Sequence, residues 1–431
     1  MNNKVLKNAS WIVVCKIIQS VLVFLIGLLT ARYLGPSNYG LINYAASIVA
    51  FFAPIMQLGF SSTLVQEFIS RPGEDGSVVG TALVWNLASA LACVIGVTAF
   101  SFIANPNEPE TVLICFLYSL TLIFQASEMV QYWFQSKLLS KYPSIATLCA
   151  YTIVSVYKIY LLASGKSVQW FALSHVIEAL LISVILLCVY RKLSGQRISF
   201  SFALGKEILR RSRPYIWSGL MVVLFQQTDR IMLKQISGEA QTGFYSATIS
   251  CIGITGFVFM AIIDSMRPTI LESKQQSEAQ FERRLKTLFL IVTALSLLQS
   301  VAYTLLAEPL ISVIYGAEFA PAAHILRITV WFVTFAYYGT VRDIWILSEG
   351  KQGILWIINL IGALTNIVGN LILIPVFGGV GAAIASLVTQ IFTNFALTLI
   401  LKPLRPCGKL MLRSLEPRFI ASLISHKKKE N

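Results

Sequence analysis

The stretch ARYLGPSNYGLINYAAS (residues 31–47) recurs near the middle of the chain as LKQISGEAQTGFYSATIS (residues 233–250). The copies align when one inserted residue is allowed in the second, with these matches: Arg32 with Lys234, Leu34 with Ile236, and Gly40 with Gly243. Each copy sets glycine, proline or serine, which favour turns, between two apolar segments. We therefore expect an antiparallel helical hairpin at each place and a chain built from two related halves.

A weaker echo supports the same division. LLASGKSVQWFALS (residues 161–174) resembles LIPVFGGVGAAIAS (residues 373–386), again about half the chain further on. Six helices per half is an even number, so the two halves run in the same direction. This predicts two six-helix lobes related by an axis along the membrane normal.

The composition requires lipid as the solvent. The chain has 431 residues, of which 56% are hydrophobic and 13% charged, and its mean hydropathy is +0.72. A single soluble core stops growing at about 250–300 residues, so it could not bury this much apolar surface. A membrane-spanning helix needs about 20 apolar residues. Twelve such runs predict an all-α polytopic membrane protein: 10–34, 41–65, 78–104, 111–136, 143–163, 168–190, 214–236, 241–266, 287–307, 323–348, 352–375 and 378–401.

The basic residues predict the orientation. Most of the 34 lysines and arginines fall in alternate loops and in the two ends, and such loops face the cytoplasm. Both termini are therefore expected there. The rule also explains the net charge of +14 without a nucleic-acid partner. The predicted division is an N-lobe (1–190), a basic cytoplasmic linker (191–213), a C-lobe (214–401) and a basic cytoplasmic tail (402–431).

The run VLFQQTDRIMLKQISG (residues 223–238) carries charges inside a predicted span. Gln226, Arg230 and Lys234 recur every four residues, and Gln227 and Asp229 flank them, which predicts a polar stripe on one helix face. Charges inside a membrane usually face a cavity or a partner. We expect the cations to bind an anionic cargo and Asp229 to orient Arg230, with ion coupling as its alternative role.

Three further residues complete the candidate site. Lys16 and Arg32 lie near opposite ends of the first predicted span and are expected to line the same cavity. Glu178 lies in the middle of the span 168–190, where it could pair with a cation or bind a coupling ion.

Several site classes are not indicated. The sequence has no GxxxxGK[ST] phosphate loop, and its histidines (175, 324 and 426) are too far apart for a metal-ligand pattern. The seven cysteines lack metal-ligand spacing and read as free thiols. No nucleophile–base arrangement is visible, so we expect no cofactor, no metal and no enzyme activity.

Three stretches resemble the polysaccharide-transporter family: TARYLGPSNYGLINYA after the first span, QQTDRIMLKQISGEAQTGFYSAT across the seventh and eighth, and IYGAEFAPAAHILRI before the tenth. The resemblance covers essentially the whole chain, because span number, orientation and motifs agree. The family belongs to the multidrug/oligosaccharidyl-lipid/polysaccharide flippase superfamily, which implies a central cavity. Within it the chain is similar to O-antigen flippases, which move undecaprenyl-pyrophosphate-linked repeat units from the cytoplasmic to the periplasmic leaflet.

The resemblance implies alternating access in the bacterial inner membrane, in lipopolysaccharide biosynthesis. The implied partners are the undecaprenyl-pyrophosphate-linked oligosaccharide, membrane lipid, a proton or sodium ion, and a polysaccharide polymerase with chain-length proteins. A drug/cation antiporter of the superfamily is an alternative, although its cargo favours excess acid in the cavity. A membrane polysaccharide polymerase is another, although it needs a large external loop. A peptidoglycan-precursor flippase usually has two further spans.

Overall fold

The computed structural model describes residues 3–194 and 196–422, which contain helices and no strand. The predicted all-α fold is therefore confirmed. The chain divides into two compact units, Met1–Gly243 and Phe244–Asn431. Gly195 of the predicted linker and residues 423–431 of the predicted tail lie outside the described residues.

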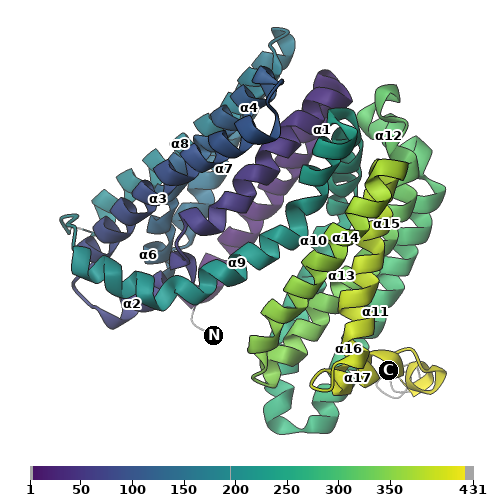
Figure 1. Cartoon of the computed structure of the whole chain (residues 1–431). Helices are drawn as coiled ribbons and strands as arrows, with labels where there is room; N and C mark the ends of the chain where they lie inside the picture. Colours follow the sequence, from purple (N-terminus) through teal and green to yellow (C-terminus); the bar gives the residue numbers. More distant parts are fainter. Residues whose placement is uncertain (1–2, 195, 423–431) are drawn as a thin grey trace. The chain divides into compact units, whose positions relative to one another are not determined.

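The first unit contains nine α-helices and two short 3-10 turns among its described residues (Figure 1). Their bounds are α1 Asn3–Met56, η1 Phe60–Ser62, α2 Leu64–Ser70, α3 Asp75–Ala104, α4 Pro109–Ser119, α5 Thr121–Gln125, η2 Ala126–Val130, α6 Gln131–Ser136, α7 Lys141–Ala163, α8 Val168–Ser194 and α9 Phe202–Ser237. The helix α10, Glu239–Gln276, begins in this unit and continues into the second.

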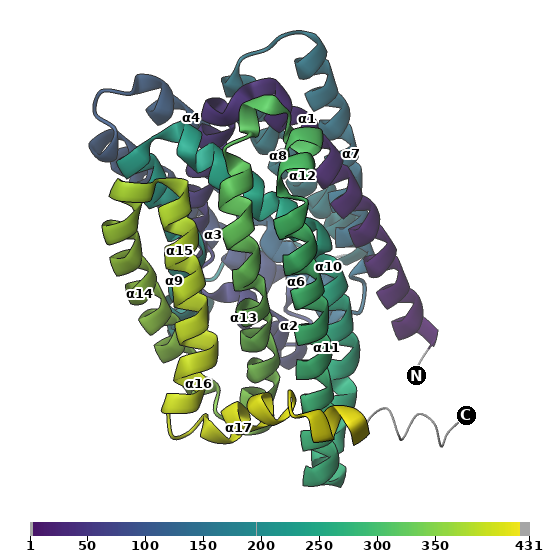
Figure 2. The same cartoon turned by 90° about the vertical axis from the view of Figure 1, so that its right-hand side faces the viewer.

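The second unit continues with α11 Glu278–Leu305, α12 Ala307–Tyr315, η3 Ala317–Phe319, α13 Ala322–Ser348, η4 Gln352–Ile354, α14 Leu355–Phe377, α15 Gly379–Gln390, the π-helical segment Ile391–Ala396, α16 Leu397–Ile400 and α17 Arg405–Arg413. In Figure 2, α17 lies across the end of the long helices of this unit. Its buried residues, Cys407, Leu410 and Met411, join the core formed by α11 and α13.

Nine helical segments of the described chain are long and apolar enough to cross a membrane. One of them, Val14–Met56, covers most of two predicted spans, 10–34 and 41–65. The predicted spans 214–236 and 323–348 fall on α9 and α13, which are not among the nine and carry charges inside their apolar runs. A multi-pass membrane protein is confirmed, whereas the count of twelve crossings stays a prediction.

Two glycines in the same unusual backbone conformation mark the repeat. Gly35 interrupts α1 with φ 70° and ψ 175°, and Gly238 separates α9 from α10 with φ 87° and ψ −179°. This left-handed region favours glycine because a Cβ atom is strained there. In each copy the second glycine, Gly40 or Gly243, comes five positions after the turn glycine. No insertion is needed, so Lys234 matches Ala31, and the predicted match of Lys234 with Arg32 is wrong by one residue.

The second glycines of the two copies pack directly against each other. A Cβ atom on Gly40 would overlap the backbone oxygen of Glu239 and lie 2.7 Å from the backbone nitrogen of Gly243. A Cβ atom on Gly243 would overlap the backbone oxygen of Pro36. The two repeated helix starts therefore cross with their backbones in contact, which explains why both copies have glycine there.

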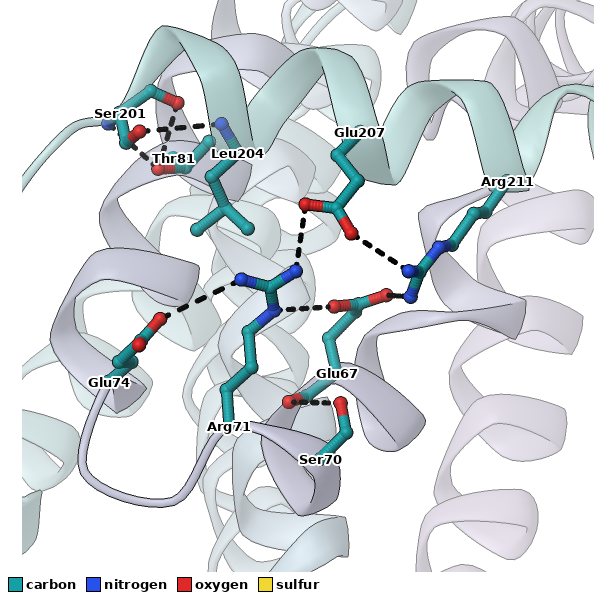
Figure 3. A network of polar contacts seen from close by, with 9 residues as sticks. All are labelled: Glu67, Ser70, Arg71, Glu74, Thr81, Ser201, Leu204, Glu207 and Arg211. Atoms are coloured by element: carbon teal, nitrogen blue, oxygen red, sulfur yellow. Dashed lines mark hydrogen bonds and ion pairs between the residues drawn. The ribbon is translucent and has the colours of Figure 1, made fainter.

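The linker before α9 is bound to the first unit. Gln196 accepts a hydrogen bond from the backbone nitrogen of Gly76 (2.8 Å), and the backbone nitrogen of Ser199 donates to the oxygen of Gly76 (3.2 Å). The backbone nitrogen of Ser201 donates to the hydroxyl of Thr81 (3.0 Å), as Figure 3 shows. Ser201 also caps α9 by accepting from the backbone nitrogen of Leu204 (3.3 Å).

Four charged residues, which we call the charged clasp, fasten the start of α9 to α2 (Figure 3). Arg71 donates to Glu67 (3.0 Å) and to Glu207 (2.8 Å), and Arg211 donates to the same two carboxylates (2.8 Å each). Glu67 is buried, with only 3% of its side chain exposed. The start of α9 is therefore part of the first unit, although the repeat makes this helix the first of the second half.

Candidate functional site

The middle of the polar stripe of α9 is joined to α1. Gln227 accepts a hydrogen bond from the hydroxyl of Ser47 on α1 (3.1 Å) and another from Nη1 of Arg230 (2.9 Å). Arg230 is half-buried, and its Nε is buried without a hydrogen-bond partner among the described residues. Leaving a buried donor unsatisfied costs about 1–3 kcal/mol, and more for a charged group. The Nε of Arg230 therefore lies within the protein without an acceptor among the described residues.

The other predicted stripe residues differ in exposure. Gln226 is exposed on α9, whereas Asp229 is buried, with 7% of the residue exposed. Lys16 and Arg32 are both exposed on α1. The structure thus brings Gln227 and Arg230 together but does not join Lys16 to them.

Lys234 lies in a closed polar cluster, which we call the Lys234 knot. Its Nζ donates to Oδ1 of Asn105 (2.8 Å) and forms an ion pair with Glu108, and it lies 5.5 Å from the centre of the Tyr44 ring. Gln235 donates to the hydroxyl of Tyr44 (2.6 Å) and to Asn105 (3.0 Å). The knot ties α9 to α1 and to the loop between α3 and α4. Lys234 thus has two acceptors and an aromatic ring as partners within the protein.

Glu108 is the accessible member of the knot. Its side chain is 48% exposed, whereas the side chain of Lys234 is only 3% exposed. The hydrogen bond from Lys234 is the main cause that lowers the pKa of Glu108 below the usual glutamate value. The hydroxyl of Thr111 lies 2.7 Å from Glu108 and 3.4 Å from Glu239 at the start of α10, so its single hydrogen is shared between the two carboxylates. The knot therefore extends through Thr111 to a further helix.

Glu178 belongs to a separate ionisable cluster in the first unit. Its carboxylate lies 4.0 Å from Nδ1 of His175 and within electrostatic range of Lys158 and Glu128. The ring of Tyr118 covers His175, with 5.0 Å between ring centres. The four ionisable groups come from three predicted spans, because only His175 and Glu178 share one. Packing of distant segments, rather than sequence proximity, therefore assembles this cluster.

The structure adds residues that sequence reasoning missed: Ser47, Tyr44, Asn105, Glu108 and Gln235. Glu108 stands in ANPNEPE, a loop without lysine or arginine, and its partner Lys234 is 126 residues away. Hydropathy and spacing report local preference and give no sign of such a pairing. Among the described residues, no group of three or more His, Cys, Asp or Glu could hold a metal ion.

Known proteins match this chain along most of its length. The model of the family described as "Polysaccharide biosynthesis protein" matches residues 5–274, and that of the MatE family matches residues 214–372. The capsular polysaccharide biosynthesis protein CapF of Staphylococcus aureus is 23% identical over 397 residues, covering 89% of this chain and 96% of CapF. The succinoglycan biosynthesis transport protein ExoT of Rhizobium meliloti (strain 1021) is 24% identical over 332 residues, covering 75% of this chain and 65% of ExoT.

Solved structures share the fold. The lipid II flippase MurJ, in an inward closed conformation, has a TM-score of 0.73 at 15% identity, covering 96% of this chain and 92% of MurJ. A multidrug resistance MATE transporter, in an inward-facing conformation, has a TM-score of 0.68 at 14% identity, covering 92% of this chain and 95% of the transporter. With the first family model matching more than half of the residues, the chain belongs to the polysaccharide biosynthesis protein family, and its apolar helices make it a multi-pass membrane protein.

Proposed function

We propose that this transporter moves undecaprenyl-pyrophosphate-linked repeat units of O-antigen or a related polysaccharide across the bacterial inner membrane. The direction is from the cytoplasmic to the periplasmic leaflet, by alternating access of the two predicted lobes, and both termini are cytoplasmic. The family match, CapF and ExoT support a polysaccharide cargo. The positive-inside pattern of the loops supports the orientation.

The observation that carries the proposal is Arg230. A guanidinium held by Gln227, with its Nε buried and unsatisfied, suits the acceptor oxygens of a pyrophosphate. A charge at the centre of a bilayer costs about 2.5–3.5 kcal/mol even on insertion scales, so a bound anion would offset a cost that the empty helix carries. Lys234, Lys16, Arg32 and the exposed Gln226 extend the same proposed path.

Replacement of Arg230 tests the assignment. Arg230→Ala should reduce translocation of the lipid-linked repeat unit by about tenfold or more, because a charge-assisted hydrogen bond contributes about 1.5–3 kcal/mol. Arg213→Ala is the matched control, since Arg213 lies exposed on the same helix. Translocation is measured in vesicles containing the purified protein, with its amount quantified. Native translocation by Arg230→Ala at native abundance would contradict the assignment.

The drug/cation antiporter is the second candidate, because the MatE model matches residues 214–372. A cationic cargo would not use the unsatisfied donor of Arg230. Export of a cationic dye that Arg230→Ala leaves unchanged, together with no movement of the lipid-linked sugar, would favour the antiporter.

Coupling to a proton or sodium ion is also proposed, with Glu178 as one site because it gathers His175, Lys158 and Glu128 around it. Asp229 is the alternative site. Transport measured with and without sodium, at matched pH gradients, separates the two ions. A polysaccharide polymerase with chain-length proteins remains the proposed set of protein partners.

A further inference from the structure

The Lys234 knot has one fixed member and one that can leave. Lys234 is enclosed by Asn105 and the Tyr44 ring, and only 3% of its side chain is exposed. Glu108 follows the end of α3 in a loop, and about half of its side chain is exposed. An anion that reaches this cluster would therefore compete with the carboxylate of Glu108 for Lys234.

Loss of Glu108 from the knot would be transmitted to other helices. The carboxylate also accepts from the hydroxyl of Thr111, whose single hydrogen is shared between Glu108 (2.7 Å) and the more distant Glu239 on α10 (3.4 Å). Glu239 stands beside the backbone contact of Gly40 with Gly243, where α1 and α10 cross. Glu108 is thus the common partner of α9, α4 and, through Thr111, the start of α10.

The charged clasp at the other end of α9 lacks this property. Both of its carboxylates accept from both arginines, so displacing one oxygen leaves each guanidinium paired. In the knot, Lys234 has a single carboxylate, and its other acceptor is the neutral amide of Asn105. One incoming anion is therefore enough to replace the carboxylate that Lys234 contacts directly, since Glu239 acts on this lysine only through longer-range electrostatics.

We propose that Lys234 and Glu108 form a cargo-sensing latch. In the empty protein the ion pair fixes the end of α9 to the loop between α3 and α4. A phosphate group of the cargo replaces the carboxylate on Lys234, and the released loop lets the end of α9 move. This inference rests on the proposed function, since it takes a pyrophosphate-bearing lipid as the anion. The latch would hold the end of α9 in place until cargo binds.

Hydrogen exchange tests the latch in the full-length protein in phosphatidylcholine nanodiscs. The reporter peptides cover residues 105–111 and 228–243. With undecaprenyl pyrophosphate present, wild-type protein should exchange about tenfold faster there, the change that a loss of about 1.4 kcal/mol in opening free energy produces. Inorganic pyrophosphate is the soluble probe, and sulfate at matched ionic strength is the control for unspecific anion effects.

Variants at the loop separate the latch from general loosening. Glu108→Gln should exchange fast without ligand and show no further response. Glu110→Gln removes an exposed acid from the first turn of α4, two residues after Glu108, and should behave as wild type. The exchanged pair Lys234→Glu with Glu108→Lys should stay slow and should not respond to either pyrophosphate, because the buried position is now an anion.

Two results would overturn the latch. One is wild-type exchange in Glu108→Gln, and the other is a pyrophosphate response that persists in the exchanged pair. A parallel translocation assay keeps the two proposals apart. If wild-type protein moves lipid-linked oligosaccharide while Glu108→Gln exchanges as wild type, the latch alone fails. If wild-type protein moves none, the proposed function fails, and the latch with it.

Discussion

The charged clasp allows burial to be tested with the bonding partners held constant. Glu67 and Glu207 each accept one hydrogen bond from Arg71 and one from Arg211, all between 2.8 and 3.0 Å. Their side chains differ in exposure, at 3% for Glu67 and 41% for Glu207. Replacing either by glutamine removes one negative charge and keeps the shape. Any difference between the two variants therefore reports burial.

The expected magnitudes follow from that difference. Removing one member of a buried ion pair costs about 3–5 kcal/mol because the other charge is left unpaired. Since Arg71 and Arg211 remain partly exposed, at 27% and 56%, we expect about 2–4 kcal/mol for Glu67→Gln. Exposed ion pairs contribute about 0.2–1 kcal/mol after screening by water and salt, so Glu207→Gln should cost no more than that.

Hydrogen exchange at the start of α9, residues 202–213, measures both variants. A factor of ten corresponds to about 1.4 kcal/mol, so Glu67→Gln should accelerate exchange by about thirtyfold or more, and Glu207→Gln by about fivefold or less. The melting temperature in nanodiscs should fall in the same order. Equal acceleration by the two variants would refute the reasoning. The stability of the start of α9 would then depend on the number of hydrogen bonds and not on the burial of the carboxylate.

Two further predictions concern the repeat and the knot. Gly40→Ala should prevent accumulation of folded protein in the membrane, because its Cβ atom would overlap the backbone of Glu239. Gly253→Ala should be tolerated, because a Cβ atom there has no other atom within 4 Å. Size-exclusion profiles after detergent extraction distinguish the two variants, and equal profiles would contradict the crossing of α1 and α10. The pKa of Glu108 is lowered by Lys234, so its contribution to stability is present above the ordinary glutamate pKa of about 4.3 and is lost as pH falls through the lower folded value. The difference in melting temperature between wild type and Glu108→Gln should therefore hold from pH 7 to about 5 and shrink in more acidic buffer; a difference independent of pH would remove the ion pair from the explanation.

The helices were predictable because hydropathy is a local property. Every predicted span falls mainly on helix, but the ends and interruptions do not follow from hydropathy. Within the predicted span 41–65, the helix α1 ends at Met56, because Leu58 and Gly59 turn the chain with positive φ. The apolar run continues beyond this turn. The predicted span 111–136 contains the 3-10 turn Ala126–Val130. Backbone turns inside apolar sequence leave no trace in composition.

The candidate site was predictable as a set of charges but not as a set of contacts. Arg230 and Lys234 were found because charges are costly in lipid. Their environments differ, since Arg230 keeps an unsatisfied donor while Lys234 is enclosed by Asn105 and Glu108. The distinction depends on Glu108, a loop residue that no periodicity connects to α9. Only the packing of distant segments supplies it.

The corrected register of the repeat adds a reason to look at these residues. With Gly35 matched to Gly238, Lys234 falls on Ala31 and Arg230 on Gly27, so neither cation has a charged counterpart in the first half. The turn and the crossing glycines obey the repeat and therefore serve the scaffold. The charges of α9 do not obey the repeat, so the scaffold does not account for them, and the proposed anion binding and the proposed latch give them a separate role.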